Sequence, residues 1–237
     1  MIDRLINLYI SSPTNYLSKD FELNETILWS IMQEIAEYLH SKVEGLSENI
    51  LKEIIRKCLI DYQKQSVDDL ISKLVDIFKY QVGLLNEFGH NSFRFIHRTF
   101  QEYLAAKSII YFNGTERTED MIYEIIKSKI DIPNWRVPLS MTFGILSKLS
   151  GLFNNIVSRL LTDEQISSNT QHSTLLVPFV IIDSLNDMYF SSKDAEYELI
   201  RKLSDMLLFD YKNVWLFKIK TTSTINSFIF LQTETQI

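Results

Sequence analysis

The chain has 237 residues, enough for one large domain or two smaller ones with a sizeable core. The net charge of −6 gives no general reason to expect binding to nucleic acid or to an acidic membrane. With one cysteine, Cys58, no intrachain disulfide can form, and no apolar run approaches the roughly 20 residues that cross a bilayer, so we expect a cytoplasmic protein with no membrane contact.

The six glycines and four prolines are few, which favours a mostly α fold. Residues 1–20 read as the tail of a helical segment that begins upstream. Apolar residues then recur at helical spacing over 27–39, 47–59 and 66–78, which predicts three helices. Asn24 is the expected cap of the first of these helices, and Ser47 opens the second.

A β-hairpin is expected next, with strands at 84–88 and 92–96 around a turn at 89–91. Three helices followed by a two-stranded ribbon is the layout of a winged helix, which we place at residues 21–113. The spacing of Thr99 and Glu102 matches a capping box and predicts that a helix begins at Thr99. His97 then lies just before a helix N-terminus, where backbone N–H groups favour anions.

Beyond Asn113 and Gly114 the pattern stays helical. Candidate helices cover 121–130, 135–149, 152–161, 175–185 and 195–208. Helices of this length joined by short breaks predict an α-solenoid-like helical array over residues 114–212. Residues 213–237 favour strand by composition and form either a hairpin or a frayed end.

Catalytic chemistry is not evident in the sequence. No Gly-x-x-x-x-Gly-Lys-Ser/Thr run is present to cradle phosphates, and no apolar strand ends in an acidic pair for Mg²⁺. The four histidines and Cys58 never cluster at metal-ligand spacing, and Cys58 shares an apolar helix face, where an inert thiol is expected. We therefore expect no catalytic residue, no metal and no enzyme activity in this chain alone.

One run resembles a known family. Residues 93–106 read Phe-Arg-Phe-Ile-His-Arg-Thr-Phe-Gln-Glu-Tyr-Leu-Ala-Ala. This is similar to the winged-helix signature of the NACHT family of signalling NTPases (the STAND class), and Trp135-Arg136 ahead of an apolar stretch fits the same pattern. The resemblance covers about residues 20–150. It implies that His97 contacts the phosphate of ADP in the closed state, and it suggests a link to innate immunity.

The resulting interpretation is the regulatory portion of a NACHT-type switch, in which the winged helix senses the ADP or ATP state and the helical repeats sense an unknown protein ligand. ADP or ATP is expected only with a NACHT ATPase core, in cis or in trans, because the core's motifs are absent. Met1 falls close to where that core would end, so a gene fragment, a split protein and a wrongly assigned start all stay open.

Three other interpretations stay open. The first is a free-standing helical scaffold that binds a protein without nucleotide dependence. The second is a DNA-binding winged helix, against which the acidic third helix argues, since Asp68, Asp69 and Asp76 outnumber Lys73 and Lys79. In the third, His97 is only a local hydrogen-bonding residue at a strand–helix junction.

Overall fold

The computed structural model describes residues 25–42, 45–59, 67–80, 84–88, 92–112, 114–163, 173–190 and 192–211. The predicted tail at 1–20, the Asn24 cap and the segment 213–237 lie outside these residues. The described chain is mostly helical, as the sequence predicts, and it forms two compact units, Met1–Phe190 and Ser191–Ile237. Among the described residues, no helix combines the length and the apolar character needed to cross a membrane.

The first part of the larger unit follows the order helix, strand, helix, helix, strand, strand. Its elements are α2 (Glu25–Ser41), β1 (Leu46–Ser47), α3 (Glu48–Cys58), α4 (Val67–Tyr80), β2 (Leu85–Glu87) and β3 (Ser92–Phe95). The three predicted helices and the predicted hairpin are confirmed. Ser47 is the N-cap of α3, as expected, and its Oγ accepts a hydrogen bond from the Ile50 amide at 3.4 Å.

A three-stranded antiparallel sheet completes this part, with the strand order β1-β3-β2. Leu85 pairs with Phe95 on one side of β3, and Leu46 pairs with Phe93 on the other. The strand β1 was not predicted. It approaches β3 so closely that a β-carbon at Gly45 would lie 1.8 Å from Ser92 Oγ, and glycine removes that clash.

The core of this part is apolar and draws on all of its helices. Helix α2 packs against α3, and α3 packs against α4. The side chains that are fully or almost fully buried there include Leu28, Ile31, Ile35, Leu51, Ile55, Leu74 and Phe78. The same positions carry the apolar periodicity that predicts the helices, so the helices form because they bury one face each.

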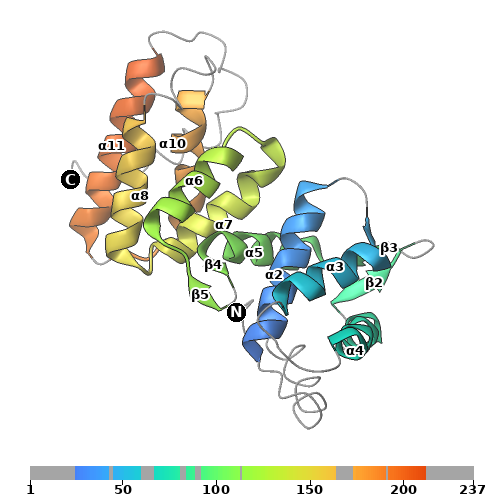
Figure 1. Cartoon of the computed structure of the whole chain (residues 1–237). Helices are drawn as coiled ribbons and strands as arrows, with labels where there is room; N and C mark the ends of the chain where they lie inside the picture. Colours follow the sequence, from blue (N-terminus) through green and yellow to red (C-terminus); the bar gives the residue numbers. More distant parts are fainter. Residues whose placement is uncertain are drawn as a thin grey trace. The chain divides into compact units, whose positions relative to one another are not determined.

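Helix α5 (Arg98–Ile110) lies between α2 and α7 (Figure 1) and packs against both. Its small buried residues Ala105 and Ala106 allow close approach on both sides. A two-stranded hairpin follows it, formed by β4 (Tyr111–Phe112) and β5 (Thr115–Glu116). Gly114 has a φ of 72°, a conformation that suits glycine in the tight turn that the sequence marks as a break.

The rest of the described larger unit is a helical array formed by α6 (Glu119–Lys129), η1 (Pro133–Trp135), α7 (Arg136–Leu146), α8 (Ser150–Thr162), α10 (Ser173–Ser184) and η2 (Leu185–Asp187). The second unit contains α11 (Lys193–Tyr211), and each predicted helix is present. Helix α6 packs against α8, and α7 packs against α5, α8 and α10. The domain boundaries expected at residues 113 and 212 stay predictions.

Candidate functional site

The candidate site is the junction between β3 and α5. Phe93 and Phe95 are buried and hold the strand against the helices. One residue further on, the Ile96 amide donates a hydrogen bond to the Leu84 carbonyl at 3.0 Å. The backbone is therefore fixed by packing and hydrogen bonding up to the residue that precedes His97.

His97 is the N-cap residue of α5, with an extended backbone (φ −128°, ψ 127°). This confirms that His97 lies directly before a helix N-terminus. Its carbonyl accepts from the Phe100 amide at 3.1 Å and from the Gln101 amide at 3.4 Å. Its side chain is exposed and makes no cap hydrogen bond, and the ring contacts Phe100 edge-to-face with the centroids 5.4 Å apart. The imidazole is thus held at the surface beside the positive end of a helix dipole.

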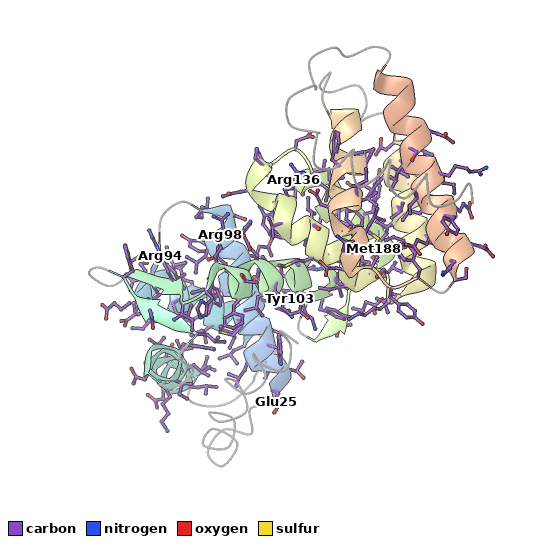
Figure 2. The ribbon with its side chains drawn as sticks, turned by 180° about the vertical axis from the view of Figure 1, so that it is seen from behind. Glu25, Arg94, Arg98, Tyr103, Arg136 and Met188 are labelled. Carbon is purple, nitrogen blue, oxygen red and sulfur yellow. The ribbon has the colours of Figure 1, made fainter. Side chains whose placement is uncertain are left out.

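Two arginines lie close to His97 in the sequence. His97 comes between Arg94 on β3 and Arg98 at the start of α5, and Figure 2 labels both arginines. The Arg94 guanidinium lies 4.5 Å from the centroid of the Phe88 ring, and Arg98 Nε donates to Glu102 Oε1 at 2.8 Å. The Arg98 side chain is 71% exposed. An imidazole, a helix N-terminus and two exposed arginines are chemically suited to an anion such as a phosphate.

The capping box predicted at Thr99 and Glu102 is wrong. Helix α5 begins at Arg98, one residue earlier, and the expected reach of Glu102 back to the Thr99 backbone is absent. The Glu102 carboxylate is bound by Arg98 instead, because a charge-assisted contact across one helical turn outcompetes a neutral backbone donor. The side-chain amide of the neighbouring Gln101 lies 3.5 Å from His40 Nδ1.

The order of helices and strands and the comparison with protein families agree. Residues 15–109 match the family described as the winged helix-turn-helix domain C-terminal to NACHT. Residues 15–109 are a NACHT-associated winged-helix domain. Neither the curated proteins nor the solved structures gave a match to this chain.

In many winged helices the helix that corresponds to α4 enters the major groove of DNA. In this NACHT-associated winged helix, that helix is acidic. Asp68, Asp69 and Asp76 are exposed, and Asp68 Oδ1 already accepts from Arg56 at 2.9 Å. Because most affinity for DNA comes from neutralised phosphates, this surface argues against a role in DNA binding.

The Trp135-Arg136 pair lies beyond the family match and joins helices of the array. Trp135 is buried in η1, and Arg136 Nε donates to Asp183 Oδ2 of α10 at 2.6 Å. The hydrogen bond to Asp183 is also the main reason why the pKa of the Arg136 guanidinium is raised above its usual value. The pair therefore has a structural role here, since it fixes the start of α7 to α10.

Sequence reasoning missed His40, which is buried near the end of α2. Its ring contacts Trp135 edge-to-face at 4.9 Å, and its Nε2 atom lies 2.6 Å from the Asn134 carbonyl oxygen. One signal was available: in the sequence His40 follows Leu39 directly and lies one helical turn after the apolar Ala36. The hydrogen-bond partner of His40 is a backbone carbonyl far along the chain, and no sequence pattern identifies such a partner.

Cys58 is buried, as its place on an apolar helix face predicts. Burial is the largest cause that raises the pKa of its thiol, to about 12, so the nucleophilic thiolate is scarce at neutral pH. Within the described residues, no three His, Cys, Asp or Glu side chains gather as metal ligands would. The junction around His97 is therefore the site that the described residues support best.

Proposed function

We propose that the chain is the regulatory portion of a NACHT-type nucleotide-dependent switch. The winged helix senses whether ADP or ATP is held by a NACHT core, and the helical array senses a ligand. The observation that carries this proposal is the match of residues 15–109 to a domain that occurs C-terminal to NACHT. On this proposal the partner of the chain is a NACHT ATPase core, in cis or in trans.

His97 is the residue that would contact the nucleotide. Its exposed ring, fixed at the N-cap of α5, can donate to a phosphate oxygen, and the helix N-terminus adds positive potential at the same turn. Phosphate contacts at helix N-termini need donors and positive potential, and both are present here. The nucleotide itself supplies the anion, and the residues of this chain supply a donor whose position is set by the buried strand β3.

In physical terms the proposed switch is a population shift. A winged helix that contacts ADP favours the closed state, and a ligand shifts the equilibrium only by as much as it prefers the open state. This requires an element with two positions and no catalytic residue. In this proposal the helical array binds the ligand, and the winged helix makes the contact with ADP that is present in the closed state and lost in the open state.

The test uses this chain reconstituted with a NACHT ATPase core from the same source. We expect His97→Ala to accelerate ADP dissociation by about tenfold or more, because a charge-assisted hydrogen bond contributes roughly 1.5–3 kcal/mol. Thr99→Ala is the matched control, since Thr99 is also exposed on the first turn of α5. Equal ADP dissociation rates in the two variants would contradict the role of His97.

A second candidate is the scaffold function, a helical module that binds a protein without nucleotide. The observation that favours it is the exposure of two apolar side chains on either side of η1, Ile132 at 44% and Val137 at 43%. On this alternative, a binding partner would associate equally well in the presence of ADP, in the presence of ATP and with neither nucleotide.

A further inference from the structure

His40 is a buried polar residue that lies between η1 and α5. Its side chain lies near the end of α2 and is 5% exposed. The ring contacts Trp135 edge-to-face at 4.9 Å, and its two nitrogens lie close to polar groups of η1 and α5. Because a buried polar group without hydrogen bonds is costly, the partners of the two ring nitrogens decide what this residue does.

The two nitrogens have different roles. Nε2 lies 2.6 Å from the Asn134 carbonyl oxygen. A carbonyl can only accept, so Nε2 carries the proton and donates, which leaves Nδ1 as an acceptor. Nδ1 faces the Gln101 side-chain amide at 3.5 Å, a long and weak contact in which the amide donates. The ring therefore bridges Asn134 and Gln101 in one defined tautomer.

These two partners belong to different parts of the fold. Asn134 lies in η1, which leads into α7 of the helical array. Gln101 lies on the first turn of α5, and its backbone amide donates to the His97 carbonyl. Only one helical turn separates Gln101 from His97. The imidazole of His40 thus connects the start of the array with the turn that carries His97.

We propose that His40 is a positioning residue that couples the helical array to the first turn of α5. The array fixes the His40 ring through the Asn134 carbonyl, and the ring holds Gln101 and with it the turn that begins at His97. The consequence for signalling rests on the proposed function of His97. A ligand that moves η1 would shift the first turn of α5, and so change the contact with the nucleotide.

The coupling is tested on the full chain alone, without nucleotide, by amide hydrogen exchange of two segments. One is the start of α5 around Phe100 and Gln101, and the other is the η1 turn, where the Trp135 amide donates to the Ile132 carbonyl. We expect His40→Leu to accelerate exchange in both segments by on the order of tenfold, because the ring no longer joins them. His40→Gln retains an amide donor near the position of Nε2 and should restore slow exchange.

Two further variants make the result specific. Ile122→Val removes one buried methyl group from α6 and controls for general destabilisation, which should not be concentrated in the two segments. Gln101→Leu leaves His40 in place and serves if His40→Leu does not fold. It should accelerate exchange at the Trp135 amide, on the other side of the ring.

The proposal is overturned if His40→Leu affects only one segment, if its pattern equals that of Ile122→Val, or if Gln101→Leu leaves the Trp135 amide unchanged. Acceleration in both segments with rescue by His40→Gln supports it. Because the measurement needs no nucleotide, failure of the role proposed for His97 would leave this result standing. Conversely, an uncoupled His40 would leave the ADP dissociation experiment unaffected.

Discussion

The ammonium of Lys129 lies 3.7 Å from the centroid of the Trp135 ring. The same Nζ atom is 3.1 Å from Glu37 Oε1 on α2, and the lysine side chain is only 13% exposed. One ammonium thus covers the aromatic residue of η1 and pairs with the helix on which His40 lies. This is a further contact between the winged helix and the array, and it depends on charge.

We expect Lys129→Met to lower the free energy of unfolding by about 1–2 kcal/mol, because a partly desolvated cation–π contact and an ion pair are lost while the apolar stem remains. Urea denaturation followed by circular dichroism measures the change. Lys148→Met is the matched control, since Lys148 is exposed. A surface substitution of this kind changes stability by at most about 0.5 kcal/mol, so equal losses in both variants would contradict the contact.

Stability should depend on pH through His40. Burial is the main cause that lowers the pKa of His40 below 6.5, against the opposing effects of the Asn134 hydrogen bond and the Glu102 carboxylate. Arg98 and Lys129 lower the pKa further. The His40 imidazole of the unfolded chain becomes protonated as the pH falls below about 6.5, whereas the folded chain resists this protonation. The free energy of unfolding is therefore highest above about pH 6.5 and decreases as the pH falls below it.

The measurement is the urea midpoint of the parent and of His40→Gln at about pH 7.5, 6.5 and 5.5. The carboxylates titrate in both proteins, so the difference between the two urea midpoints at each pH removes their contribution and leaves that of His40. We expect the parent to lose more stability than the variant as the pH falls. Parallel pH profiles would show that His40 does not resist protonation in the folded state.

The helix caps provide a matched comparison. Ser47→Ala should cost about 0.5–1 kcal/mol, because the Ser47 hydroxyl accepts the amide of Ile50 and that acceptor would be lost. His97→Ala should cost little stability, since the His97 ring makes no cap hydrogen bond. Thermal unfolding of the two variants measures both effects. A larger loss in His97→Ala would show that the ring serves the fold.

The contact between α5 and α7 should not tolerate a larger side chain. Ala106 is fully buried, and its carbonyl lies 3.4 Å from Thr142 Oγ1 of α7. Ala106→Leu is expected to cost about 1–3 kcal/mol through overpacking. Ala195→Leu, at an exposed position of α11, is the control and should leave urea stability almost unchanged. A stable Ala106→Leu protein would mean that α5 and α7 can move apart.

Sequence reasoning predicts the helices well because α3 and α4 have a clear apolar face and α3 and α6 have side-chain caps, at Ser47 and Thr118. Ser47 was expected to open α3, and its hydroxyl does cap that helix. The strand β1 escaped prediction because two residues, Leu46 and Ser47, carry no periodicity. Gly45 also leaves room for the Ser92 side chain of β3, a relation that appears only when both strands are placed.

The sequence predicted the position of His97 in the candidate site but not the side-chain contacts around it. A local motif places His97 at the start of a helix, and the structure agrees. The capping role of Glu102 was wrong because its partner, Arg98, competes with the backbone amide that a local pattern assumes. The bond from His40 to Asn134 spans 94 positions, and no short pattern can report it.

Helix α5 also limits how this protein can change over evolutionary time. The family match ends at residue 109, one residue before the helix ends, yet α5 is buried against α2 on one side and α7 on the other. A recombination event that attached this winged helix to an unrelated array would leave the α7 side of α5 without a fitting surface. Through α5, a substitution that changes the size of a side chain in one region therefore restricts which side chains fit in the other.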